Sequence, residues 1–118
     1  MRRSVCLAAV VTVLVPSAAL AELYAAIAFS PSTGRSGTSW NYNSQNEAET
    51  EAYYQCGIED CDTVLWFTQC GAIAVGDGYG YGTGYATSLN TATNTALQYC
   101  DGYANNCQIT AAFCNDGY

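Results

Sequence analysis

The sequence has no histidine and no lysine, and its three basic residues are the arginines Arg2, Arg3 and Arg35. Histidine is the commonest general base in enzymes, and lysine forms the usual Schiff base with carbonyl substrates. Binding to nucleic acid requires a basic face that neutralises phosphates, and three arginines do not provide one. We therefore expect no nucleic-acid binding and no catalysis that depends on a histidine base or a lysine nucleophile.

Long hydrophobic runs are also scarce. The run Val5–Val15 is too short to cross a bilayer comfortably, and no later segment reaches 18 apolar residues, so we expect no membrane span. Arg2 and Arg3 precede this run and Ala19-Leu20-Ala21 follows it, which is the pattern of a secretory signal peptide. We expect removal of residues 1–21, leaving residues 22–118 as one small domain, secreted or periplasmic.

This expected mature chain is strongly acidic. It keeps Arg35 alone against ten Asp and Glu residues, which gives a net charge of −9. Such a surface favours a cationic partner, although charge of one sign also simply keeps an exported protein soluble.

Motifs for catalysis or metal binding are weak. No Gly-x-Ser-x-Gly elbow is present. Paired carboxylates can cleave glycosides, but most of the acids stand where helix starts and loops favour solvated charge. Glu59-Asp60-Cys61-Asp62 lacks the alternating ligand spacing of an EF-hand, so only a weak surface calcium site remains as an alternative. We predict no catalytic residue, metal or cofactor; the carboxylates considered are Glu47, Glu49, Glu51, Glu59, Asp60, Asp62, Asp77 and Asp101.

The sequence does contain an internal repeat. The segment Tyr24–Phe29 (YAAIAF) recurs 46 positions later as Cys70–Val75 (CGAIAV). The series Ala48, Ala52, Cys56 recurs 44 positions later as Ala92, Ala96, Cys100. A period near 45 residues with constant internal order indicates one supersecondary unit that is present twice.

The repeat also predicts the disulfide pairing. Six cysteines follow the signal, and an even number in a short exported chain indicates a disulfide framework. If the two repeats share a fold, a local Cys56–Cys61 bridge corresponds to a Cys100–Cys107 bridge, which leaves Cys70 with Cys114. Structural zinc is the alternative, and the lack of His and of Cys-x-x-Cys disfavours it.

Each repeat predicts two strands, a helix and a strand. Ser44 followed by Glu47 is a capping-box pattern, and Gly57 suits the end of that helix. We expect an α+β domain of two fused β-β-α-β repeats, about 23–69 and 70–114, with a common sheet of up to six strands and both helices on one face. We expect a strand at Asp62–Phe67 that is buried on both sides and a hairpin at Thr68–Gly71 that joins the repeats. The other expected strands are Tyr24–Phe29, Thr38–Tyr42, Ala72–Val75, Tyr81–Ala86 and Gln108–Cys114, with helices at about 44–56 and Asn90–Cys100.

A segment of alternating glycine and tyrosine, Gly76–Tyr85, is the strongest candidate for a site. As a strand it places Tyr79, Tyr81 and Tyr85 on one face and glycines on the other. Tyrosine rows suit protein interfaces or sugar stacking. The alternative is structural, since glycines also admit a close helix or strand and tyrosines can complete a thin core.

The sequence resembles the bacterial family of domains of unknown function 4189. The likeness rests on the stretch AIAFSPSTGRSGTSWNYNSQNEAETEAYYQC, on CGAIAVGDG and on the spacing of Cys100, Cys107 and Cys114. The resemblance implies a small exported, disulfide-bonded bacterial domain without established catalytic residues.

Two classes of function follow from these observations. The first is an acidic binding or inhibitory module that docks on a cationic protein or a cell-envelope component. The alternatives are a structural envelope protein and a carboxylate-dependent polysaccharide hydrolase, which the missing His and Lys disfavour.

Overall fold

The computed structural model describes residues 22–118, so the expected signal peptide lies outside the described residues. Its elements follow the order β-β-α-β twice, with one short 3₁₀ helix in the second repeat. Their bounds are β1 Tyr24–Phe29, β2 Ser36–Tyr42, α1 Gln45–Cys56, β3 Asp62–Phe67, β4 Cys70–Val75, η1 Asp77–Tyr79, β5 Tyr81–Ala86, α2 Leu89–Asp101 and β6 Gln108–Cys114.

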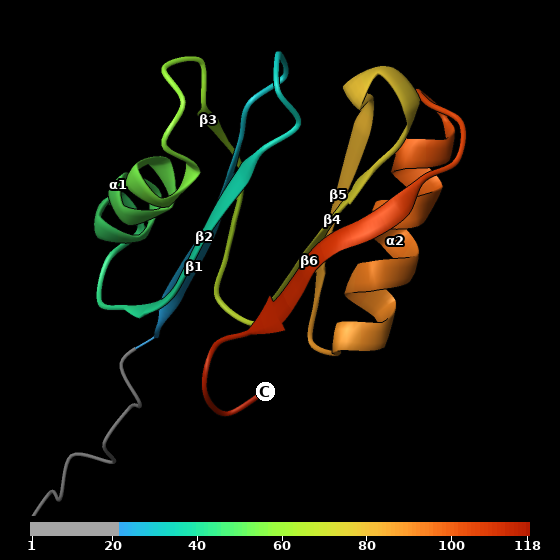
Figure 1. Cartoon of the computed structure of the whole chain (residues 1–118). Coiled ribbons are helices and arrows are strands. Elements are labelled where there is room, and N and C mark those ends of the chain that lie inside the picture. The colour runs from blue at the N-terminus through green and yellow to red at the C-terminus, as the bar shows by residue number, and fades with distance from the viewer. Residues whose placement is uncertain (1–21) are drawn as a thin grey trace, which may run out of the picture.

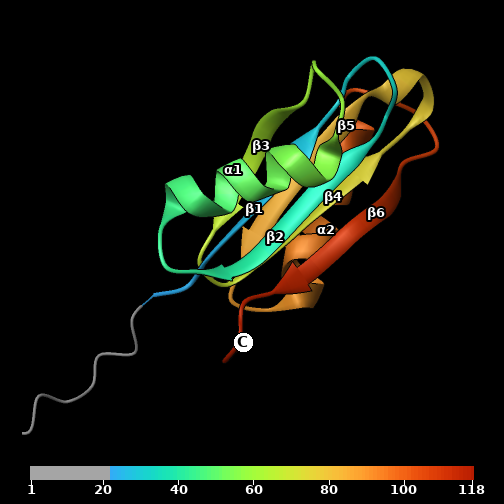
Figure 2. The ribbon, with the colours of Figure 1, turned by 60° about the vertical axis from the view of Figure 1, so that its left-hand side comes forward.

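The strands form two antiparallel three-stranded sheets, in the orders β2-β1-β3 and β5-β4-β6. The α+β class and the two β-β-α-β repeats are confirmed, but the expected common sheet of six strands is wrong. The two sheets stack face to face, and α1 and α2 cover opposite outer faces (Figure 1). Figure 2 shows α1 lying across the outer face of β1 and β2. Each repeat therefore contributes one helix and one sheet to a four-layer domain.

The central strands explain this arrangement, because each is apolar on both faces. In β1, Ala26 and Ala28 pack against α1, while Ile27 and Phe29 pack in the core between the sheets. Ile73 of β4 lies in the same core between the sheets. A strand that is apolar on both faces needs cover on both, and a single sheet with both helices on one face would leave the other face in water.

Two further expectations about the strands are wrong. Strand β3 is an edge strand whose Asp62 and Trp66 are exposed, so it is not buried on both sides. Strands β3 and β4 lie in different sheets, so Thr68–Gly71 forms no hairpin; the chain passes here from one sheet to the other.

The helices begin and end as their sequence predicts. Ser44 caps α1 by accepting a hydrogen bond from the Glu47 N–H, and Gly57 closes the helix in the left-handed region at φ 72°. Ser88 caps α2 in the same way. Each helix turns a face of two alanines and one cysteine to its sheet: Ala48, Ala52 and Cys56 in α1, and Ala92, Ala96 and Cys100 in α2.

Three disulfides stabilise these layers in the pairing expected from the repeat. Cys56–Cys61 joins the end of α1 to the start of β3, and Cys100–Cys107 joins α2 to β6, with Cα–Cα distances of 6.3 and 6.0 Å. Cys70–Cys114 links β4 to β6 directly across the sheet, at 4.0 Å. Three disulfides in so small a domain indicate an oxidising compartment. Among the described residues, no helix is both long and apolar enough to cross a membrane.

Candidate functional site

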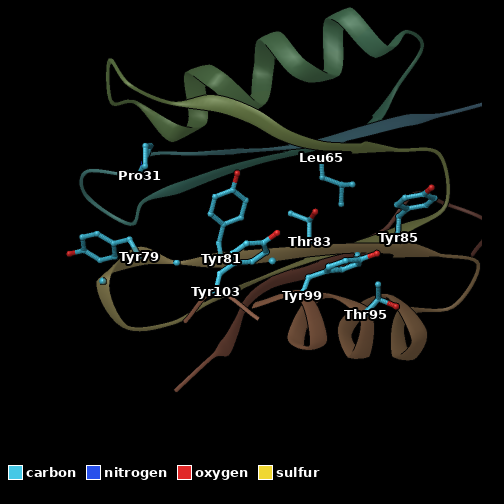
Figure 3. Close-up of a pocket in the computed structure, with 13 residues that line it drawn as sticks. Pro31, Leu65, Tyr79, Tyr81, Thr83, Tyr85, Thr95, Tyr99 and Tyr103 are labelled. Carbon is cyan, nitrogen blue, oxygen red and sulfur yellow. The ribbon is translucent and has the colours of Figure 1, made fainter. Parts of the chain in front are cut away.

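A groove of about 910 Å³ runs along β5, between α2 and the first repeat. Strand β5 lies along its length, α2 and the segment after it supply one wall, and two residues of the first repeat supply the other (Figure 3). Five tyrosines share this lining, and we call it the tyrosine groove: Pro31, Leu65, Gly78, Tyr79, Gly80, Tyr81, Gly82, Thr83, Gly84, Tyr85, Thr95, Tyr99 and Tyr103.

The alternation of β5 produces one side of the groove. Gly82 and Gly84 face α2 so closely that a Cβ atom on either would meet helix backbone, with Ala96 O at 2.5 Å from one and Ala96 N at 2.7 Å from the other. The glycines therefore have the structural role considered for them, a close approach of helix to strand. Tyr81 and Tyr85 alternate with these glycines, so their side chains leave the opposite face of the strand.

Tyr79 does not belong to this strand, contrary to the expectation of one row of three tyrosines. It ends the 3₁₀ helix η1 and has a positive φ of 64°, an uncommon conformation for a residue with a side chain. Its ring lies over Gly34 in the turn of the first repeat, 2.6 Å from the place that a Cβ on that glycine would occupy. The groove thus includes Tyr79, Tyr81 and Tyr85, but from two elements.

Tyr99 and Tyr103 also line the groove and were not among the predicted site residues. Tyr99 extends toward the groove from the last turn of α2, and Tyr103 from the turn that follows the helix; they are largely exposed, at 60% and 79%. A signal for them was available: Thr95, Tyr99 and Tyr103 follow one another at four-residue steps, directly beside the buried Ala92, Ala96 and Cys100 face. Leu65 and Pro31 were also missed, because only the stacking of the two sheets brings the first repeat to β5.

The groove is uncharged, and its chemistry is that of aromatic rings and hydroxyl groups. Tyr81 packs on Phe29 of β1 with ring centroids 4.8 Å apart, which holds this ring against the core between the sheets. Tyr85 is 71% exposed and free to meet a ligand. Such a lining can stack on a partner and donate hydrogen bonds from phenol groups.

The carboxylates considered for catalysis lie elsewhere, and none lines the tyrosine groove. Glu47 lies at the start of α1, where Ser44 Oγ donates to its carboxylate, and Glu51 accepts from Gln55 on the same helix. Asp77 accepts from Asn106 at 2.7 Å. Within residues 22–118, no group of three or more His, Cys, Asp or Glu is placed to hold a metal ion.

Asp60 is the acid with the most specific surroundings. Ser30 Oγ donates to its Oδ1 at 2.5 Å, and the backbone N–H of Ser32 donates to its Oδ2 at 3.1 Å. The hydrogen bond from Ser30 is the largest cause that lowers the pKa of Asp60, followed by that from Ser32. This carboxylate closes the turn next to Pro31 and thereby supports one end of the tyrosine groove.

The first repeat carries a smaller groove of about 310 Å³ at the corresponding place, along β2 and α1. Its lining is more polar and includes one acid: Thr38, Ser39, Trp40, Tyr42, Glu51 and Gln55.

Fold and groove together define a duplicated, disulfide-bonded α+β domain with two stacked sheets between two helices. The chain belongs to the family described as Domain of unknown function (DUF4189), whose model matches residues 24–114. It is similar to the protein Rv1269c of Mycobacterium tuberculosis (strain ATCC 25618 / H37Rv), with 44% identity over 57 residues, 48% of this chain and 45% of that protein.

It is also similar to the protein Rv1813c of the same strain, with 45% identity over 51 residues, 43% of this chain and 35% of that protein. The matched segments therefore span less than half the length of these two relatives. The NMR structure of Rv1813c has the same fold, with a TM-score of 0.62 and 29% identity over 80% of this chain and 76% of that one.

Proposed function

We propose that this protein is an exported binding module that docks on a cationic protein or cell-envelope component through the tyrosine groove. Export requires the signal peptide expected in residues 1–21, with cleavage near Ala21. The observation that carries the proposal is the convergence of five tyrosines from β5, η1 and the end of α2 on one groove. Exposed apolar patches with polar edges are typical of interaction sites, and tyrosine is enriched among the residues that dominate binding energy.

The charge of the chain adds a preference for the partner. Residues 22–118 carry one arginine against ten acids, while the groove itself is uncharged. The net negative charge attracts a cationic partner from a distance, and the tyrosines then provide the contact area. The three disulfides hold the groove in one conformation, which lowers the entropy cost of binding.

A triple variant tests this function. Tyr85→Ser, Tyr99→Ser and Tyr103→Ser remove the three most exposed rings of the groove and leave Tyr81, which packs on Phe29, in place. Wild type and variant serve as baits for envelope extract of the producing bacterium, and affinity is then measured with the purified basic partner. We expect affinity to fall at least about 100-fold, because tyrosine hot spots contribute about 2 kcal/mol each.

Tyr54→Ser is the matched control, because Tyr54 is 69% exposed on α1 and lies outside the groove. It should bind like wild type. The association rate should fall as ionic strength rises from about 0.01 to 0.15 M, since the Debye length shrinks from about 30 to 8 Å. Unchanged affinity in the triple variant, with an unchanged far-UV spectrum, would show that the contact surface lies elsewhere.

A further inference from the structure

The four edge strands of the two sheets are not equally protected. An open edge presents unpaired N–H and C=O groups, and proteins commonly interrupt such edges with bulges, charges or proline. In β2 the pairing with β1 shifts register between Tyr24 and Ala26, and Asn41 adopts a positive φ of 63°. The pairing of β3 with β1 shifts between Ile27 and Ala28, and that of β6 with β4 shifts between Ile73 and Ala74.

Strand β5 lacks every one of these devices. All six of its residues pair with β4 in unbroken register, from Val75↔Tyr81 to Cys70↔Ala86. Its sequence, YGTGYA, contains no charge and no proline. It is the one edge strand of the described residues that is both regular and uncharged, and such an edge is a template for another strand.

This open edge lies within the tyrosine groove. Every residue from Tyr81 to Tyr85 lines it, and the walls stand on both sides of the sheet plane. Tyr99 and Tyr103 reach the groove from the α2 side, and Leu65 and Pro31 from the side of the first repeat (Figure 3). A strand added to β5 would therefore point alternate side chains at the two tyrosines of one wall and at Leu65 in the other.

We infer that β5 accepts an extended peptide segment of a partner protein, which adds a fourth strand to the sheet β5-β4-β6. This inference rests on the proposed function and specifies its ligand. Six residues of β5 give room for a strand of about 20 Å, at about 3.4 Å per residue. Main-chain hydrogen bonds to the edge supply affinity, and the two walls select side chains at alternate positions.

The acids indicate the chemistry of that peptide. Two carboxylates lie at the end of the groove that Pro31 and Tyr79 line. Asp60 accepts a hydrogen bond from the N–H of Ser32, next to Pro31, and Asp77 begins the 3₁₀ helix that Tyr79 ends. No acid lines the groove itself. The peptide therefore has uncharged side chains along β5 and basic residues at the Pro31 end. An oligosaccharide would use the rings without needing a regular strand edge, so the peptide is the better match.

Synthetic peptides test the inference on the disulfide-bonded protein recovered from the periplasm of an expression host. A phage library of random decapeptides supplies the probe, and the best binder is resynthesised in two forms, N-methylated at its odd or at its even positions. An added strand turns alternate N–H groups to β5, so one form should lose affinity by about tenfold or more and the other should bind within about threefold of the parent. Amide exchange should slow in β5 and remain unchanged in β2.

The failures are distinguishable. If both methylated forms bind like the parent peptide, strand addition is wrong. The groove would still be supported as a binding site if the parent peptide fails to bind Tyr85→Ser/Tyr99→Ser/Tyr103→Ser and still binds Tyr54→Ser. If a tetramer of N-acetylglucosamine perturbs the groove and no peptide does, the site takes sugar and the inference is wrong. If β5 amides are already protected in a dimer without peptide, a second copy occupies the edge, which also overturns it.

Discussion

The two repeats place a groove at the same position, along an edge strand and the neighbouring helix. The first groove is the smaller, at about 310 Å³, and its lining includes Trp40, Tyr42 and one acid; the second, at about 910 Å³, has five tyrosines and no charge. The buried helix faces establish the correspondence. Gly37 lies against Ala52 and Cys56 of α1, as Gly82 lies against Ala96 and Cys100 of α2. On this alignment Ser39 corresponds to Gly84, and the helix residues Glu51 and Gln55 to Thr95 and Tyr99.

The difference lies in the residues that face outward. Most positions between helix and sheet keep alanine, cysteine and glycine in both repeats, because close packing tolerates little else; the exception is Ser39, which stands where the second repeat has Gly84. At the groove, the first repeat has an acid and an amide where the second has a threonine and a tyrosine, and its edge strand is interrupted where β5 is continuous. One scaffold thus presents an interrupted edge beside a groove that carries an acid in one copy, and a continuous edge beside an uncharged groove with five tyrosines in the other.

Removal of Cys70–Cys114, a bridge that has no counterpart in the first repeat, should have the largest effect on stability. The corresponding positions hold Tyr24 and Thr68, and Tyr24 packs on Trp66 with ring centroids 6.2 Å apart. A Cys70→Ser/Cys114→Ser variant opens a loop of sequence separation 44 and should lose about 4 kcal/mol on the chain-entropy model. Cys56→Ser/Cys61→Ser, with separation 5, should lose about 2 kcal/mol. Urea unfolding followed by far-UV circular dichroism measures both, and equal losses would contradict this ranking.

An exchange of the residues at Ser39 and Gly84 tests how closely each helix approaches its strand. Ser39 Oγ donates to Ala48 O at 2.6 Å, so α1 leaves room for a side chain. A Cβ on Gly84 would meet the backbone of Ala92 and Ala96, which can move only if α2 moves. Gly84→Ser should therefore cost about 3 kcal/mol in the free energy of unfolding and widen the tyrosine groove. Ser39→Gly should cost about 1–2 kcal/mol through one buried hydrogen bond and a more flexible strand.

Gly78→Ser is the control for Gly84→Ser, because it introduces a serine into the same glycine-rich segment away from α2. No atom lies within 4 Å of the place that a Cβ on Gly78 would occupy. A serine held there at a φ of 68° should cost about 1–2 kcal/mol in the free energy of unfolding. A Gly84→Ser protein as stable as wild type would show that α2 is not held against β5 in solution.

Much of the fold follows from particular residues in the sequence. Ser44, Glu47 and Gly57 predict both ends of α1, and the repeated Ala-Ala-Cys series predicts which helix face is buried. The division into two sheets was not predictable in this way, because Ala25, Ile27 and Phe29 show that β1 needs cover on a second face without showing what provides it. Likewise, Tyr81 and Tyr85 could be singled out from their alternation with glycine. The four-residue steps of Thr95, Tyr99 and Tyr103 indicate one side of α2, but they do not show that this side lies beside β5.

Asn115 is a second departure from symmetry, since it connects the end of the second repeat to the first. Its buried amide accepts from Asn41 N at 2.8 Å and donates to Leu23 O and Phe67 O at 3.3 Å. Asn115→Ala should cost about 2–3 kcal/mol, because it removes three hydrogen bonds of a buried side chain, to the Asn41 N–H and to the Leu23 and Phe67 carbonyls. Gln69 stands 46 positions earlier, is only partly buried, and its substitution by Ala should change stability by less than about 0.5 kcal/mol. Equal effects in thermal unfolding would mean that the two ends of the repeats are interchangeable.

The smallest expected effect concerns the turns that precede β2 and β5. In each repeat an acid connects this turn to the loop after the helix, but the acid belongs to the turn in one repeat and to the loop in the other. In the second repeat the acid belongs to the turn itself, since Asp77 accepts from Asn106 of the loop after α2. In the first repeat the acid belongs to the loop after α1, since Asp60 accepts from Ser30 and Ser32 of the turn.

Acid should therefore loosen the first turn by protonating Asp60. The Ser30 hydrogen bond lowers the pKa of Asp60 in the folded state, so its contribution to stability is complete above the unfolded value near about pH 4 and is lost as pH falls through the lower folded value. We expect the amide resonance of Ser32 to hold its position down to about pH 4 and to shift below it, with a midpoint under the ordinary value for aspartate. In Asp60→Asn the shift should vanish while global stability changes little, because the carboxylate is solvent-exposed. A Ser32 midpoint at or above the ordinary aspartate value, or the same shift in Asp60→Asn, would show that another group controls this turn.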